Sequence, residues 1–247
     1  MLTLAACSGG ATESSPTPTS PTPTATGTPA PTPSATANDT AAPTTEPPSE
    51  TQPPSETDPP VAAVTILSPV DKDHALPADY VPPGLLTVPV AYLAPGFPGE
   101  LRQEAVDALV LMLDDADAAG HDVRARSAYR SYATQESTFN YWVSVLGYDE
   151  AVRVSAMPGH SEHQLGTTAD LTSPGVGWDL VESFGQTAAG QWLAANAHDY
   201  GFAPSYPAGA EAITGYSYEP WHFRYLGTIE AQAWNASGLT LNQYLLQ

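Results

Sequence analysis

The stretch Pro158-Gly-His-Ser-Glu-His-Gln-Leu-Gly-Thr-Thr-Ala-Asp170 holds two histidines, a glutamate and an aspartate within thirteen residues. A second polar cluster, Glu219-Pro-Trp-His222, follows later in the chain. Together the two clusters offer three good metal ligands and a spare carboxylate. They predict a domain that folds so as to bring these two distant segments to one metal site.

The candidate metal ligands are His163, Asp170 and His222. Two imidazoles and one carboxylate are a common ligand set for a catalytic zinc ion, whose fourth position is left to water. Such a zinc lowers the pKa of its water towards neutrality and polarises a carbonyl oxygen. The other histidines outside the two clusters lack supporting partners in the sequence and are expected to be structural: His74, His121 and His198.

Two further residues suit catalysis next to such a metal. Glu219 lies three residues before His222, so a tight turn would let its carboxylate face the metal's water as a general base and later protonate a leaving amine. Arg130 is one of only seven basic residues, and its planar fork suits a carboxylate or a developing oxyanion. Taken alone, Glu219 could be solvated and Arg130 could belong to a surface ion pair. The combination favours the catalytic interpretation.

Composition divides the chain into two parts. Fourteen of the 26 prolines lie in the first 60 residues, which carry six acidic and no basic side chains. Residues 8–62 are rich in Ser, Thr and Pro and have few large apolar side chains, which predicts a disordered, semi-stiff spacer. Residues 63–247 are expected to form the catalytic domain. The net charge of −20 repels phosphate backbones and argues against nucleic-acid binding.

The N-terminus resembles a bacterial lipoprotein signal. Leu4-Ala5-Ala6-Cys7 is similar to a lipobox, so residues 1–7 are interpreted as a signal remnant with Cys7 as the lipidated residue. The positively charged segment that usually precedes a lipobox is missing, and an incidental cysteine is the alternative. This interpretation predicts anchoring to the outer face of the cytoplasmic membrane by lipid alone, because no apolar run is long enough to span a bilayer. A single cysteine also excludes an intrachain disulfide.

The hydrophobic pattern of the second part predicts several helices and short strands. Four segments show helical spacing or helix-terminating glycines, and four others have the length and alternation of strands. Because they do not alternate regularly, they favour an α+β domain over a doubly wound sheet. The predicted helices are residues 100–119, 134–146, 149–154 and 187–200, and the predicted strands are residues 121–128, 167–171, 213–218 and 221–225, with a further short strand at Phe202.

The motifs resemble those of a known enzyme family. Ser161-x-His163-x-x-Gly166-x-x-Ala169-Asp170 and Glu219-x-Trp-His222 are similar to the paired signatures of the zinc D,D-carboxypeptidases that include VanY-type and VanX-type peptidases. The VanY-type branch is favoured, because the similarity extends over nearly all of residues 70–227. It includes four stretches: Leu76-Pro-Ala-Asp-Tyr80, Ser127-Ala-Tyr-Arg-Ser-Tyr132-x-x-Gln135, Ser155-Ala-Met-Pro-Gly-His-Ser-Glu-His163, and Thr214-Gly-Tyr-x-Tyr-Glu-Pro-Trp-His-Phe-Arg-Tyr225.

The resemblance implies a fold, a reaction and a set of roles. The fold would be a small central antiparallel sheet flanked by helices, of the type shared by hedgehog proteins and D,D-peptidases. One zinc ion would be bound by the three predicted ligands, with Glu219 as base and Arg130 as electrophilic or substrate-binding residue. The expected reaction removes the terminal D-alanine from peptidoglycan stem peptides. Ser161 and Gln135 would contact the substrate, whereas His160 and Glu162 would play supporting roles.

One departure from the family and three alternative functions remain open. Ser205 stands before Tyr206-Pro207 where the family commonly has an arginine, which could alter specificity or rate. Related enzymes also act as L,D-carboxypeptidases or as endopeptidases on peptidoglycan peptides. A non-catalytic wall-binding module with a structural metal site is the alternative of another class, although structural zinc sites usually have four protein ligands.

Overall fold

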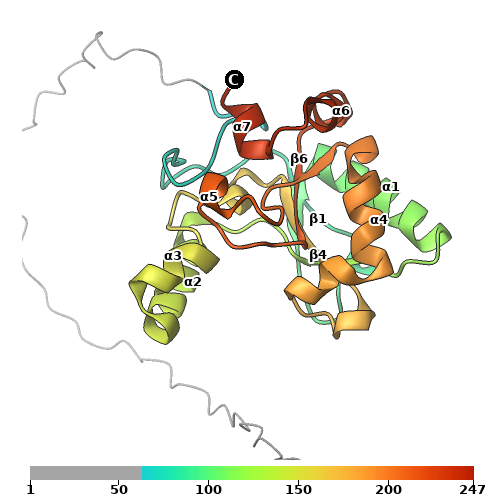
Figure 1. The fold of residues 1–247 in the computed structure, drawn as a ribbon, viewed down its shortest axis with the longest axis horizontal. Helices are drawn as coiled ribbons and strands as arrows, with labels where there is room; N and C mark the ends of the chain where they lie inside the picture. The colour runs from blue at the N-terminus through green and yellow to red at the C-terminus, as the bar shows by residue number, and fades with distance from the viewer. Residues whose placement is uncertain (1–62) are drawn as a thin grey trace, which may run out of the picture. The chain divides into compact units, whose positions relative to one another are not determined.

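The computed structural model describes residues 63–247, so Cys7 and the predicted spacer lie outside the described residues. Within this range the chain forms two antiparallel sheets and seven α-helices, joined by short 3₁₀ turns (Figure 1). The strands are β1 (Leu85–Thr87), β2 (Glu100–Arg102), β3 (Arg124–Ser127), β4 (Thr168–Thr172), β5 (Phe202–Pro204) and β6 (His222–Tyr225). The helices are α1 (Gln103–Ala118), α2 (Tyr132–Leu146), α3 (Tyr148–Val154), α4 (Ala188–Asn196), α5 (Glu211–Thr214), α6 (Thr228–Ser237) and α7 (Leu241–Leu245).

The larger sheet has four strands in the order β3-β4-β6-β5, and each neighbouring pair is antiparallel. β1 and β2 form a separate two-stranded sheet. The elements follow no regular strand–helix alternation, which is the pattern of an α+β domain. The predicted fold class, a small antiparallel sheet flanked by helices, is therefore confirmed.

The two faces of the four-stranded sheet differ in chemistry because successive side chains of a strand point to opposite sides. Ala169, Leu171 and Phe223 lie on one face and pack into the main hydrophobic core with residues of α1 and α4. Asp170 and His222 alternate with them and lie on the other face. The sheet thus separates an apolar core from a polar site.

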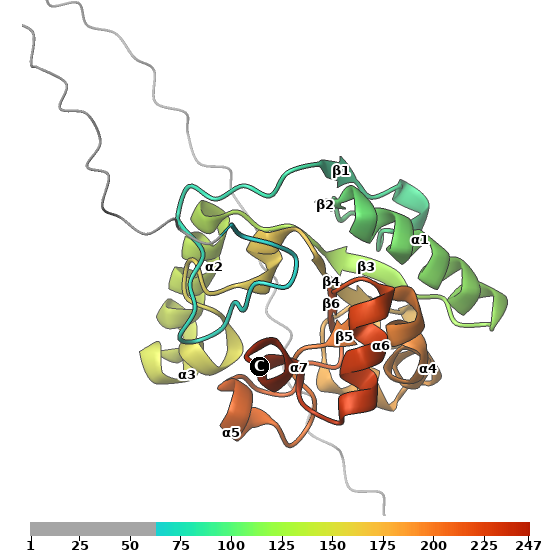
Figure 2. The same cartoon turned by 90° about the horizontal axis from the view of Figure 1, so that it is seen from above.

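The helices lie on both sides of this sheet. Figures 1 and 2 place α1 and α4 on one side and α2, α3 and α5 on the other. One face of α1 carries buried apolar side chains at a 3–4 spacing, which drives the packing of this helix. No helix within residues 63–247 is long and apolar enough to cross a bilayer.

Most predicted elements are present, with shifts at their ends. Residues 100–102 form β2 instead of the first turn of a helix, because Leu101 pairs with Leu86 of β1 and is buried there. The predicted helix 187–200 begins after the N-cap Thr187 and changes to a 3₁₀ turn over Ala197–Tyr200. Gly201, whose φ of 88° suits glycine, ends that turn as expected.

The prediction of a strand over residues 213–218 is wrong. α5 occupies Glu211–Thr214 and ends at Gly215, whose φ of 74° breaks any extended run. Residues 216–221 that follow are irregular and lead directly into β6. The C-terminal helices α6 and α7 were not predicted, since they bury few side chains and carry only weak apolar periodicity.

A segment without helix or strand, residues 64–76, crosses the polar side of the domain before β1, and we call it the strap. It runs past α7 and α5 in both views (Figure 2). Leu76 donates a backbone hydrogen bond of 2.9 Å to Gly159, in the loop that precedes the metal-binding motif. The strap is therefore fixed to the same part of the molecule as the candidate site.

Candidate metal centre and cleft

The structure brings the three predicted metal ligands together. Asp170 of β4 and His222 of β6 are direct cross-strand partners, so the register of the sheet places their side chains next to each other. His163 comes from the 3₁₀ turn Glu162–Leu165, five residues before the start of β4. One ligand atom from each of the three residues lies within 4.8 Å of the others, and all three side chains are buried.

Each histidine is oriented by a hydrogen bond at the ring nitrogen that points away from Asp170. His163 Nδ1 lies 2.7 Å from the Ala128 carbonyl oxygen and must donate to it, which leaves Nε2 facing Asp170. His222 Nε2 lies 3.0 Å from Glu162 Oε2, and its Nδ1 lies 3.2 Å from Asp170 Oδ1. Metal-binding histidines usually donate the other ring N–H to a carboxylate or a backbone carbonyl in this way.

The site fits a zinc ion. Asp170 Oδ1 is buried and accepts no well-aligned hydrogen bond, so this oxygen is available to a cation. Nε2 of His163, Nδ1 of His222 and the Asp170 carboxylate form the set of two imidazoles and one carboxylate found in catalytic zinc sites. No further His, Cys, Asp or Glu joins this cluster among residues 63–247, so a position remains for water or substrate.

Glu219 lies at the edge of this cluster. Its Oε2 is 3.5 Å from His222 Nδ1, and its side chain is 15% exposed. A backbone hydrogen bond from His222 to the Glu219 carbonyl forms the expected tight turn. Burial, with help from the nearby carboxylates of Asp170 and Glu162, raises the pKa of Glu219 to about 7, although His222 and Arg130 oppose this. A carboxylate with such a pKa suits proton transfer near neutral pH.

The cluster opens into a cleft of about 570 Å³. Arg130 follows β3 and lines this cleft together with Ser161, whose Oγ lies 3.4 Å from Arg130 Nη2. The cleft therefore holds a guanidinium, which suits a peptide's terminal carboxylate, next to the candidate metal site. Other lining residues come from α2, from α3 and the loop after it, and from the irregular segment before β6; they include Trp142, Arg153, Ala156, Tyr216, Tyr218 and Trp221.

Gln135 lies behind the wall of this cleft. It is fully buried, and its Nε2 donates to the Ala156 carbonyl at 2.6 Å and to Ser155 Oγ at 3.3 Å. Because Ser155 and Ala156 line the cleft and Gln135 does not, its amide supports the wall. A direct contact between Gln135 and a substrate stays a prediction.

Glu162 and Arg224 form a buried ion pair behind the metal cluster. Arg224 Nη1 donates to Glu162 Oε1 at 2.8 Å, and Arg224 is fully buried. Burial alone would raise the pKa of Glu162, but Arg224, His222 and Ser205 together lower it to about 2. Sequence reasoning did not single out Arg224, although strand alternation two residues after His222 places it on the polar face.

Ser205 contacts this ion pair. Its Oγ donates to Glu162 Oε2 at 2.5 Å, and it lines a separate cavity of about 20 Å³ on the far side of Glu162. The departure from the arginine expected at this position therefore falls beside Glu162. Arg224 provides the positive charge that neutralises that carboxylate.

Comparisons with known proteins agree with this geometry. Residues 99–228 match the family model described as VanY: D-alanyl-D-alanine carboxypeptidase. YodJ of Bacillus subtilis (strain 168) is 42% identical over 184 residues, which cover 72% of this chain and 66% of that protein. The bifunctional D-Ala-D-Ala dipeptidase and D-Ala-D-Ala carboxypeptidase VanXYC of Enterococcus gallinarum is 30% identical over 181 residues, 71% of this chain and 90% of its own length.

Solved structures show the same fold. The LdcB LD-carboxypeptidase is 41% identical, with a TM-score of 0.68 over 73% of this chain and 86% of that one. A D,D-pentapeptidase VanY from a VanB-type resistance cassette, in complex with Zn(II), is 29% identical, with a TM-score of 0.61 over 72% of this chain and 98% of that one. The motifs, the metal cluster and these similarities together show that the chain is a zinc metallopeptidase and belongs to the VanY D-alanyl-D-alanine carboxypeptidase family.

Proposed function

We propose that this enzyme removes the C-terminal D-alanine from peptidoglycan stem peptides, with stems that end in D-Ala-D-Ala as the first candidate substrate. The observation that carries this proposal is the convergence of His163, Asp170 and His222 with Glu219 and Arg130 in one cleft. Such a site, in which a cationic group lies beside a metal and a base, suits a metal-dependent carboxypeptidase. The D-Ala-D-Ala activity named for VanXYC supports the choice of substrate.

In this proposal the bound metal, Glu219 and Arg130 each have a separate role in the reaction. A zinc ion, when bound, lowers the pKa of a water and polarises the scissile carbonyl. Glu219 takes a proton from the attacking water and delivers it to the amine of the departing D-alanine. Arg130, held near Ser161, binds the terminal carboxylate or stabilises negative charge on the carbonyl oxygen.

Tetrapeptide stems are the second candidate substrate. Cleavage there would break an L,D bond and would also release D-alanine. This candidate rests on the LdcB LD-carboxypeptidase, which is more similar in sequence than the VanY structure. The two candidates share the metal, the base and the leaving group, and they differ in the stereochemistry of the residue before the cut bond.

Product analysis on the two substrates side by side tests this proposal. Zinc-loaded enzyme is incubated with a pentapeptide ending in D-Ala-D-Ala and with the matching tetrapeptide, and D-alanine is quantified. We expect release from at least one of them, and loss of release after chelation with recovery on adding zinc. If neither peptide loses D-alanine while zinc is fully bound, the proposed function is wrong.

We further propose that Cys7 carries a lipid and that the enzyme works outside the cytoplasmic membrane on the cell wall. The support is the lipobox-like sequence and the proline-rich segment that follows it. In a host that processes lipoproteins, the wild-type chain should sediment with membranes and incorporate labelled fatty acid. The Cys7→Ser variant should do neither, and equal labelling of both chains would refute the anchor.

A further inference from the structure

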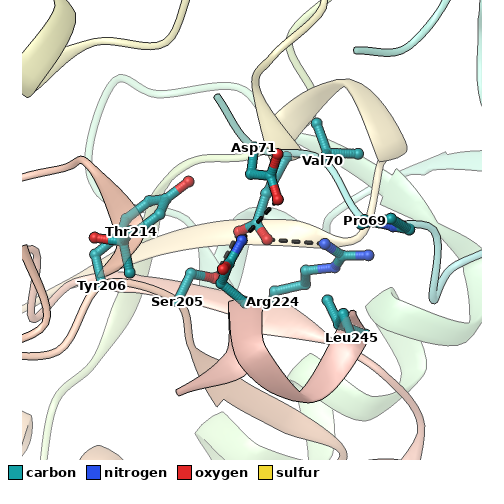
Figure 3. A pocket seen from close by; sticks show the side chains of 10 residues that line it. Pro69, Val70, Asp71, Ser205, Tyr206, Thr214, Arg224 and Leu245 are labelled. Carbon is teal, nitrogen blue, oxygen red and sulfur yellow. Dashed lines mark hydrogen bonds and ion pairs between the residues drawn. The ribbon is translucent and has the colours of Figure 1, made fainter. Parts of the chain in front are cut away.

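The strap lies against residues that surround His222 of the metal cluster. Its backbone and side chains reach His222 by two separate routes, one polar and one aromatic. The polar route passes through Arg224 and Glu162, and the aromatic route passes through Tyr216 and Tyr206. Figure 3 shows part of this region, with Val70 and Asp71 of the strap facing Ser205 and Arg224 across the small cavity.

The polar route is a continuous chain of short hydrogen bonds. Arg224 Nη2 donates to the carbonyl oxygens of Ile66 at 2.8 Å and of Ser68 at 2.7 Å. Its Nη1 donates to Glu162 Oε1 at 2.8 Å, and Glu162 Oε2 accepts from His222 Nε2 at 3.0 Å. Since Glu162 accepts the Nε2 proton, the lone pair of His222 Nδ1 is directed at the metal cluster.

The aromatic route begins at Lys72, the only lysine in the chain. Its ammonium lies 3.5 Å from the centroid of the Tyr216 ring and donates to the Val152 carbonyl. The Tyr216 and Tyr206 ring centroids are 4.7 Å apart, and those of Tyr206 and His222 are also 4.7 Å apart. Tyr206 thus packs against the His222 ring, while Glu162 accepts a hydrogen bond from Nε2 at the edge of that ring.

Further bonds prevent the strap from moving independently. His160 Nδ1 lies 2.7 Å from the Asp71 carbonyl oxygen, and Asn242 of α7 donates to Asp71 Oδ2 at 2.7 Å. The cavity between the strap and Glu162 has a volume of only about 20 Å³. Packing this tight leaves little freedom for Arg224 or Glu162 to shift without displacing the strap.

We propose that the strap is a functional part of the metal centre, and that Glu162, Arg224 and Lys72 are positioning residues that fix the ring of His222 for metal binding. The proposal rests on the proposed zinc binding by His163, Asp170 and His222. The first segment of the catalytic domain thereby also determines how tightly the domain holds its metal.

Zinc affinity measured on single variants of the full chain tests this role. Glu162→Gln keeps the size of the side chain but leaves a single acceptor oxygen, so it cannot accept hydrogen bonds from Arg224 and His222 through two oxygens as Glu162 does. We expect the zinc dissociation constant to rise about 10- to 100-fold. Lys72→Met keeps the aliphatic stem and loses the ammonium, and we expect a rise of about 2- to 5-fold. Glu136→Gln, at an exposed position on α2, is the matched control and should bind zinc as the wild type does.

Competition with a chromophoric chelator gives the dissociation constants, and thermal unfolding in excess chelator shows that each metal-free variant is folded. Lys72→Met lies at a half-buried position and keeps the test valid if Glu162→Gln does not fold. Folded variants with wild-type zinc affinity would overturn the proposal. A wild-type enzyme that binds zinc tightly but releases no D-alanine would contradict the proposed function and leave this inference intact.

Discussion

Replacement of Glu219 by alanine is expected to lower turnover by about 10²- to 10⁴-fold, the usual contribution of a general acid–base residue, while zinc stays bound. The expectation follows from the position of Glu219, which is next to His222 but outside the cluster of three ligands. Burial raises its pKa to about 7, so it is poised to accept and donate a proton. The measurement is D-alanine release under saturating zinc, with metal content determined on the same samples.

The metal content separates this role from the alternative one. Glu136→Ala on α2 serves as a control for the loss of a carboxylate, because Glu136 is exposed and lies outside the cleft lining. If Glu219→Ala loses both activity and zinc, Glu219 is a metal ligand and the assignment of the base is wrong. If it keeps most of its activity, another group must move the proton.

Replacement of Arg224 by methionine is expected to reduce the free energy of unfolding by roughly 3–5 kcal/mol. Arg224 and Glu162 are both buried and joined at 2.8 Å, and removal of one partner leaves the other as an uncompensated buried charge. The loss of two hydrogen bonds to the carbonyls of the strap adds to this effect. Chemical denaturation of metal-free protein at constant pH measures the change.

A double variant tests whether the unpaired buried carboxylate of Glu162 causes the loss of stability. In Arg224→Met with Glu162→Gln no buried carboxylate is left unpaired, so the double variant should be more stable than Arg224→Met alone. Arg124→Met is a suitable control, because the ion pairs of Arg124 with Asp117 and Asp122 lie at the surface and contribute little. A loss of less than about 1 kcal/mol for Arg224→Met would show that the ion pair has no such structural importance.

The residues of the candidate metal cluster could be predicted from the sequence because local patterns place them. Asp170 lies in a short strand after Gly166, His163 lies just before it, and His222 follows Glu219 at a turn-like spacing. The chemistry of a catalytic zinc needs these residue types, and the structure brings them within 4.8 Å of each other. The four helices from residue 103 to residue 196 could be predicted for the same reason, since hydrophobic periodicity is a local property. The antiparallel arrangement of the strands was expected only from the resemblance to the family.

Other features depended on contacts between distant segments. Residues 100–102 form a strand because Leu101 pairs with Leu86 of β1. Gln135 has the sequence position of a cleft residue but is buried behind Ala156. In each case the backbone partner or the neighbouring wall comes from a part of the chain that no local pattern indicates.

By itself, the sequence determined the residue types of the site, the order of most elements and the family to which the chain belongs. Only the tertiary structure decided how His222 is held, because Glu162, Arg224, Ser205 and the strap are separated from one another by tens of residues in the chain. The physical reason is that a metal ligand is specified by its own side chain, whereas its orientation is specified by buried hydrogen bonds that form only when the whole domain has folded.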